Sequence, residues 1–207
     1  MAETQMLREI REIPAVVARQ VTANADVYRE AGERLRREPP RFVVSCARGS
    51  SDQAVTYFKY LLETGVGIPV ASIGPSIASV YGASLKLEGA MLLTVSQSGG
   101  SPDLVSVQES ARAGGARTVA LLNVPESPVG DAAETVLPLF AGPEKAVAAT
   151  KSFVASLVAV ASLVAAWSED RALSDALERL PEALEQALGC DWSAAQVPVA
   201  AAHSLYT

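Results

Sequence analysis

Histidine and cysteine are scarce in this sequence, which has one histidine, His203, and two cysteines, Cys46 and Cys190, among its 207 residues. With a single histidine, neither a histidine-based metal site nor a Ser-His-Asp triad is expected. The two cysteines lie in different segments without the spacing of metal ligands, so we expect no metal and no cofactor. The pair favours a reducing cytoplasm over a disulfide scaffold, with Cys46 as a small buried residue at the end of a strand.

Positive charge is also limited, because the formal net charge is −6 and no long basic run occurs. We therefore expect neither nucleic acid nor an anionic membrane surface as a partner. The polar N-terminus lacks the apolar segment of a targeting signal. The longest apolar stretch, residues 153–167, is shorter than the ~20 residues that span a bilayer, so a buried helix is predicted there. An interface helix would have the same sequence, and the expected location of the protein is the cytoplasm.

Helical and strand patterns alternate along the chain. Apolar spacing predicts helices over 3–12 and 14–37, and continuous apolar runs predict strands over 41–46, 69–73, 90–95, 117–122 and 135–139. This alternation is typical of an α/β protein whose parallel sheet is covered on both faces. Residues 174–188 are predicted to form a helix with leucines along one packing side, kinked or split at Pro181.

The most informative segment is Ser96-Gln97-Ser98-Gly99-Gly100-Ser101-Pro102-Asp103, which follows an apolar strand and precedes a helix. Its glycines allow close backbone approach to a ligand, and the N–H groups of a helix N-terminus favour an anion. The serine and glutamine side chains add neutral donors for phosphate oxygens. In the simpler interpretation, this is an ordinary loop in which Ser101 or Asp103 caps the helix.

Two further loops share this character. One is Ser45-Cys46-Ala47-Arg48-Gly49-Ser50-Ser51-Asp52, and the other spans residues 142–153, with the sequence GPEKAVAATKSF. Each follows a predicted strand and precedes a predicted helix. All three loops should therefore meet at the carboxyl edge of the sheet, where open α/β folds bind ligands.

Four strings in order, CxRGSSD, PSxxSVYG, SQSGxSPD and AGPExxVAATKSF, resemble the sugar isomerase (SIS) family. The resemblance runs from the opening residues 9–14 (EIREIP) to about residue 163. It is greatest to isomerase-type glucosamine-6-phosphate deaminases and to the isomerase half of glucosamine-6-phosphate synthase. It implies a three-layer αβα sandwich with a five-stranded parallel sheet in flavodoxin-like order. Ala47 and Gly100 depart from the family pattern, which usually has glycine at the first position and a larger residue at the second.

The resemblance also implies site residues for a sugar phosphate. Four side chains are expected on the phosphate, with Ser51 beside them: Ser96, Gln97, Ser98 and Ser101. Backbone groups of Val147 and Ala148 are expected to face the sugar. Ser50, Glu144 and Lys151 remain open. The role of a surface acid explains Glu144 equally well, and that of a charged residue at a helix start explains Lys151. No residue here matches the family's proton-transfer glutamate or ring-opening histidine, so no catalytic residue is assigned.

Relatives of this type carry two SIS modules, and the missing catalytic groups lie in the second. The expected division is N-terminal helices over 1–40, an SIS domain over 41–168, and a helix and linker over 169–207 toward a second module. Residues 197–207 look like the approach to that module's first strand. We therefore expect a first module of a longer protein, although a natural single-module protein is the alternative.

Two functions remain open from the sequence. In the first, the protein belongs to an enzyme that isomerises or deaminates an amino-sugar phosphate, for which this chain supplies the phosphate anchor. In the second, it is a module that senses a phosphosugar without converting it. A regulator with a DNA-binding helix-turn-helix is disfavoured, because the 40 residues before the first strand are few and lack a basic face. The expected partners are a sugar phosphate and a second copy of the chain.

Overall fold

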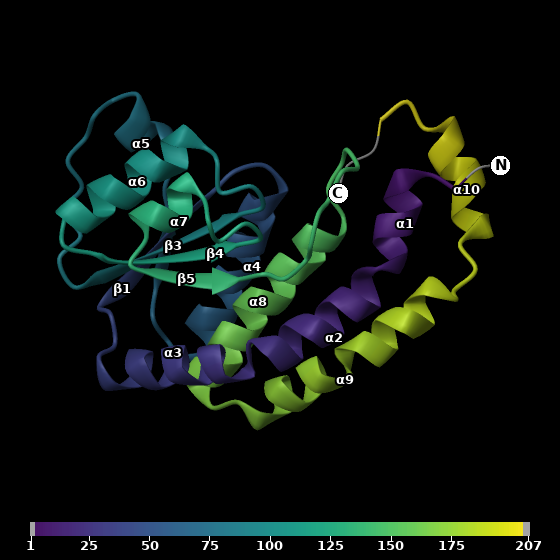
Figure 1. Cartoon of the computed structure of the whole chain (residues 1–207), viewed down its shortest axis with the longest axis horizontal. Helices are drawn as coiled ribbons and strands as arrows, with labels where there is room; N and C mark the ends of the chain where they lie inside the picture. The colour runs from purple at the N-terminus through teal and green to yellow at the C-terminus, as the bar shows by residue number, and fades with distance from the viewer. Residues whose placement is uncertain (1–2, 205–207) are drawn as a thin grey trace.

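The computed structural model describes residues 3–204, and its centre is a five-stranded parallel sheet in the order β2-β1-β3-β4-β5 (Figure 1). The strands are β1 (Phe42–Ala47), β2 (Val70–Ser72), β3 (Ala90–Ser96), β4 (Arg117–Leu122) and β5 (Thr135–Pro138). All four pairings are parallel. Each strand falls within a residue or two of its predicted range.

Helices cover both faces of this sheet (Figure 1). They are α1 (Gln5–Arg11), α2 (Ile13–Ala23), α3 (Ala25–Arg37), α4 (Ser50–Gly65), α5 (Ser76–Ser79), α6 (Pro102–Ala113), α7 (Pro128–Ala132), α8 (Lys151–Ser168), α9 (Arg171–Leu188) and α10 (Ser193–Ala201). Helices α5, α6 and α7 lie on one face, and α3, α4 and α8 lie on the other. The predicted three-layer α/β sandwich is confirmed.

The strands supply two separate cores because their side chains alternate between the faces of the sheet. Met91, Leu93 and Val95 of β3 join the core beneath α4 and α8. Leu92, between them, joins the core beneath α6 and α7. Every residue of β3 is buried, as expected for a central strand covered on both sides.

Helix α8 is the predicted buried helix. It is long and apolar enough to cross a membrane, but 67% of its residues are buried within the protein. It packs against α2, α3, α4 and α9. At Gly32 of α3, an added Cβ would lie 2.5 Å from the carbonyl oxygen of Ala166. Glycine at this position therefore lets the two helices approach closely.

The predicted helix over 14–37 is wrong in its continuity, because α2 and α3 are separate helices joined at Asn24. The Asn24 side chain is buried and donates a hydrogen bond of 2.7 Å to the carbonyl oxygen of Pro138. This long-range contact holds the junction of α2 and α3 against the end of β5. Apolar spacing alone does not reveal such a contact.

Two predictions about the C-terminal segment also need correction. Helix α9 continues through Pro181 without being split, because Leu173, Leu177, Leu180 and Leu184 pack on α2 and α8 on both sides of the proline. Residues 197–201, part of the segment predicted as the approach to a strand, belong to α10. Alanine favours helix in this segment. The predicted segment 197–207 also includes 205–207, which lie outside the described residues.

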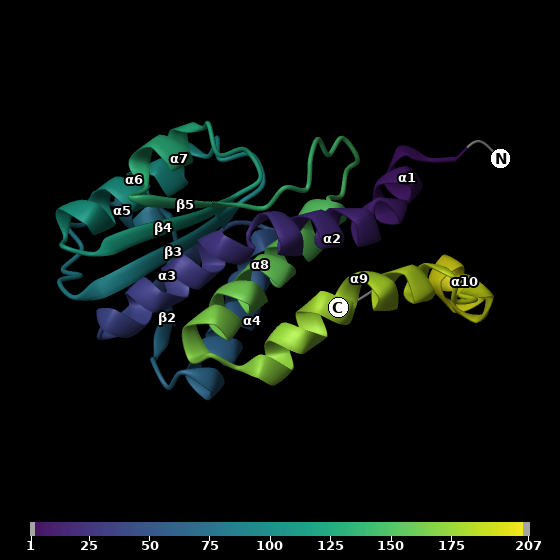
Figure 2. The ribbon, with the colours of Figure 1, turned by 60° about the horizontal axis from the view of Figure 1, so that its bottom comes forward.

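The end of α9 and all of α10 lie away from the sheet (Figure 2). Residues 185–204 are exposed throughout. This stretch presents apolar side chains to solvent, including Trp192, 67% exposed, and Val197, 76% exposed.

Candidate functional site

The order of the strands places the ends of β1 and β3 at a switch point of the sheet. These strands are neighbours, with Ala47 beside Val95 at the carboxyl end. The chain leaves β1 toward α4 on one face and leaves β3 toward α6 on the other. At such a switch point the two loops diverge, and open α/β folds bind ligands there. The first two predicted loops therefore lie next to each other.

The loop after β3 is shaped by its own serines and glycines. Ser96 is buried, and its Oγ accepts a hydrogen bond of 3.1 Å from the N–H of Gly99. The Oγ of Ser98 accepts a hydrogen bond of 3.3 Å from the N–H of Gly100. Ser98 is exposed, whereas Gln97 and Ser101 are half-buried. The loop thus contributes hydroxyl and amide groups at the β1/β3 switch point.

Gly99 is required by both conformation and space. Its φ is +62°, a region that side-chain-bearing residues rarely adopt. An added Cβ would lie 2.0 Å from Oγ and 2.7 Å from Cβ of Ser127, at the start of α7. Gly100 differs, because the nearest atom to an added Cβ is Ser98 Oγ at 3.7 Å.

An ion pair joins the two neighbouring loops. Arg48, after β1, donates to Oδ2 of Asp103 in the first turn of α6 at 2.5 Å. The carboxylate of Asp103 would otherwise repel an anion at this helix N-terminus, and the guanidinium offsets its charge. The pair also links the ends of β1 and β3 through side chains.

Helix α4 begins directly after Gly49, whose φ is +58°. The N-cap residue is Gly49 itself, which has no side chain to accept a hydrogen bond from the first N–H groups of the helix. Ser50 and Ser51 form its first turn, the former exposed and the latter half-buried. The start of α4 therefore offers N–H groups and two hydroxyls beside the loop after β3.

The third loop is different, because the N-terminus of α8 already has a carboxylate. Glu144 accepts hydrogen bonds from the N–H groups of Thr150 at 2.7 Å, Lys151 at 2.8 Å and Ser152 at 3.3 Å. It also accepts one from the Ser152 hydroxyl. Lys151 is buried, and its Nζ lies 2.5 Å from Oε2 of Glu12. Two of the three open candidates, Glu144 and Lys151, are thus engaged with protein groups.

Val147 and Ala148 lie in the exposed part of this loop, and Val147 is 96% exposed. The preceding residues are fixed by a side chain to which the sequence analysis gave no role. Glu9 of α1 accepts hydrogen bonds from the N–H groups of Lys145 at 2.7 Å and Ala146 at 3.0 Å. Glu9 lies in the opening EIREIP string, which is the signal that could have identified it.

Burial by itself would raise the pKa of Glu9. Hydrogen bonds from Gln5, Lys145 and Ala146, together with the nearby charge of Lys151, outweigh burial and lower that pKa below its usual value. The group is therefore a carboxylate at neutral pH.

Two more side chains hold the start of this loop. Asn123, directly after β4, accepts from the N–H of Ala141 at 2.8 Å and donates to the carbonyl oxygen of Gly142 at 2.9 Å. Arg19 of α2 donates to the carbonyl oxygen of Phe140 through Nη2 at 2.6 Å. A polar residue immediately after a strand was the available signal for Asn123, whereas nothing local marks Arg19.

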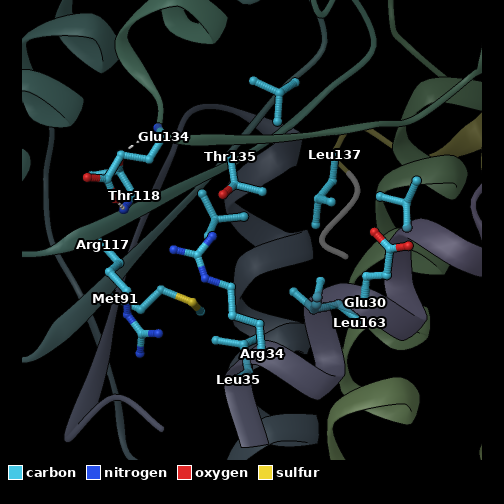
Figure 3. A pocket seen from close by; sticks show the side chains of 14 residues that line it. Glu30, Arg34, Leu35, Met91, Arg117, Thr118, Glu134, Thr135, Leu137 and Leu163 are labelled. Atoms are coloured by element: carbon cyan, nitrogen blue, oxygen red, sulfur yellow. Dashed lines mark hydrogen bonds between the residues drawn. The ribbon is translucent and has the colours of Figure 1, made fainter. Parts of the chain in front are cut away.

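A cavity of about 250 Å³ lies elsewhere, between α3 and the strands β4 and β5 (Figure 3). It has an apolar lining that includes Leu35, Leu137 and Leu163, and Arg34 points toward it from α3 (Figure 3). Arg117, the first residue of β4, also lines it, so the cavity lies toward the amino ends of the strands. It is separate from the three loops. Within residues 3–204, no group of three or more His, Cys, Asp or Glu residues could hold a metal ion.

The two glycines of the loop after β3 provide a matched test of its geometry. We expect Gly99→Ala to lower the free energy of unfolding by roughly 1–3 kcal/mol, because it adds positive-φ strain and an overlap with Ser127. Gly100→Ala, with open space around it, should change that energy by less than about 0.5 kcal/mol. Urea unfolding of the two variants measures both values, and equal losses would contradict this account of the loop.

A family model for the SIS domain matches residues 38–166 of this chain. Glutamine–fructose-6-phosphate aminotransferase [isomerizing] of Methanothermobacter thermautotrophicus is 37% identical over 186 residues, which are 88% of this chain and 30% of that protein. The chain thus spans about a third of the length of the curated relatives that it matches.

Solved structures agree with this assignment. A Silicibacter pomeroyi protein, provisionally named a phosphosugar isomerase, superimposes with a TM-score of 0.93 at 46% identity, over 96% of this chain and 61% of that one. Glucosamine-6-phosphate deaminase of Thermotoga maritima shares the fold, with a TM-score of 0.69 at 17% identity over 86% of this chain and 54% of that one. The predicted resemblance is confirmed, and the chain belongs to the SIS domain family.

Proposed function

We propose that this chain is a phosphosugar-binding SIS domain of an enzyme that isomerises or deaminates an amino-sugar phosphate of the glucosamine-6-phosphate or fructose-6-phosphate type. One observation carries the proposal: two loops with free hydroxyl groups and helix N-termini meet at the β1/β3 switch point. The names of the relatives support the substrate class, since they include fructose 6-phosphate and phosphosugars.

In this proposal, the loop after β3 binds the phosphate. The hydroxyls of Ser98 and Ser101 and the amide of Gln97 donate to its oxygens, and Ser96 holds the loop through its bond to Gly99. Ser51, with Ser50 beside it, donates from the adjacent start of α4. The backbone of Val147 and Ala148 faces the sugar. Neutral donors and helix N-termini suit a doubly charged phosphate without requiring a lysine.

The proposed division of the chain is helices over 1–40, the SIS domain over 41–168 and a connecting segment over 169–207. The match of the family model to 38–166 supports the central range. We place the protein in the cytoplasm, in line with the metabolic activities named for its relatives. The second candidate is a module that binds a phosphosugar without converting it, the alternative that the sequence leaves open.

The hydroxyls of Ser98 and Ser101 provide the direct test. Replacing either with alanine removes a charge-assisted hydrogen bond worth roughly 1.5–3 kcal/mol, so affinity for fructose 6-phosphate should fall about ten-fold or more. Ser106→Ala is the matched control, because that hydroxyl lies one turn further along α6 and donates to the carbonyl oxygen of Pro102. Calorimetry showing unchanged affinity in both loop variants would remove the loop from the site.

We also propose that the chain forms a homodimer. The apolar face of α8 and the leucines of α9 are packed within one chain, so they do not require a partner. Three exposed apolar side chains of the C-terminal segment remain, Trp192, Val197 and Val199, and we propose that they pack against a second copy of the chain. Light scattering at micromolar concentration should give twice the chain mass, and Trp192→Glu should shift it toward the monomer. A monomeric wild-type chain would contradict the proposal.

Turnover separates the two candidate functions. We expect this chain alone to bind glucosamine 6-phosphate with ammonia release and fructose 6-phosphate formation near background. Binding without a general acid or base forgoes a factor of typically ~10²–10⁴ in rate. A coupled assay for both products measures this on the purified chain. Turnover of the order of ~1 s⁻¹, in the ordinary enzyme range, would show that the proton-transfer group lies within these residues.

A further inference from the structure

We propose that Glu9 is a positioning residue for the sugar side of the site, acting through the backbone of residues 145–148. This inference rests on the proposed function, because it assigns a role toward the same ligand. Glu9 lies on α1, outside the sheet and its three loops, and it would act on the ligand only through the loop that it holds.

The contacts are specific to a carboxylate. Oε1 of Glu9 accepts from the N–H of Lys145 at 2.7 Å, and Oε2 accepts from the N–H of Ala146 at 3.0 Å. Two oxygens on two successive N–H groups fix the orientation of both peptide units. The next two residues, Val147 and Ala148, are the ones proposed to face the sugar. Glu9 therefore sets the direction in which the backbone enters these two residues.

A second side chain of α1 holds the Glu9 carboxylate in this position. Gln5, one turn earlier on α1, donates to Oε1 of Glu9 at 2.9 Å and fixes the side chain. Glu9 is 1% exposed, so water does not compete for its oxygens. At the far end of the loop, Glu144 holds the N–H groups of residues 150–152. Two carboxylates therefore bracket the exposed residues 147–149 and hold both ends in place.

A purely structural role for Glu9 would be to attach α1 to the body of the protein. A second polar link exists near that attachment, because Glu12, the residue that ends α1, pairs with the buried Lys151 at 2.5 Å. The Lys151 link reaches the start of α8, whereas the Glu9 link reaches the loop itself. Substitution of Glu9 should thus disturb residues 145–148 more than the packing of the helices.

The test compares two ligands in the full chain. In the proposed site, inorganic phosphate requires only the loop after β3 and the start of α4, whereas fructose 6-phosphate also requires the backbone of residues 147–148. We expect Glu9→Gln, which loses the charge and one acceptor, to weaken fructose 6-phosphate binding about ten-fold while phosphate affinity stays within about two-fold. Glu9→Asp keeps the charge but has a shorter side chain, so its affinity for fructose 6-phosphate should lie between those of the wild type and Glu9→Gln. Glu3→Gln is the control, since this exposed acid pairs with Arg11 and does not contact the loop.

Each outcome is decisive. A selective loss for the sugar phosphate supports positioning. Equal losses for both ligands, with a lower melting temperature, assign Glu9 a structural role and overturn the inference, as does unchanged affinity for both. If Glu9→Gln fails to fold, the Glu9→Asp ratio of the two affinities decides in the same way. If the wild-type chain binds neither ligand, the proposed function fails first, which is a different result from wild-type binding with an unselective variant.

Discussion

The parallel pairing of β1 with β3 is the constraint on which the rest of the structure depends. Six residue pairs align these strands, from Phe42 beside Ala90 to Ala47 beside Val95. Because α4 and α6 then cover opposite faces, the pairing separates the two cores and also places the two loops at the switch point. A slip of one residue would turn the side chains of β3 to the wrong faces. Core packing and site geometry therefore have the same origin.

The three loops at the carboxyl edge divide their electrostatic roles. Throughout the described chain, the N-cap residues of α4 and α6 provide no side-chain hydrogen bond to their helices. At α6, Pro102 has no N–H and Oδ1 of Asp103 accepts from the N–H of Leu104 at 3.0 Å, so the start of α4 offers an anion the more accessible N–H groups. The N-terminus of α8 is filled by Glu144, and the loop before it is held by Glu9. A negatively charged group is thus favoured at the β1/β3 switch point and disfavoured at the N-terminus of α8. This asymmetry is consistent with a ligand that has a phosphate at one end and uncharged hydroxyls at the other.

Local sequence patterns were sufficient for the sheet, because buried parallel strands appear as apolar runs and their loops contain Gly and Ser at the edge. The order of the strands came from the family resemblance. Features set by distant contacts were not predictable: Asn24 divides two helices through its bond to Pro138, and α9 runs through Pro181 because its leucines pack on both sides. In the site, the loop residues follow strands and are visible in the sequence. Glu9 lies in the EIREIP string, but its contacts were not predictable, because its partners are 136 and 137 residues away.

That separation also sets the order in which the site can form during synthesis. Helix α1 leaves the ribosome well before its acceptor loop, since Lys145 follows Glu9 by 136 residues. At about 5–20 residues per second, the delay is about 7–27 s. The β1–β3 pairing and the loop after β3 can be complete within this interval, while the buried carboxylate of Glu9 still lacks its N–H partners. In the proposed site, the loop that contains Val147 and Ala148 is thus completed after the loop that follows β3.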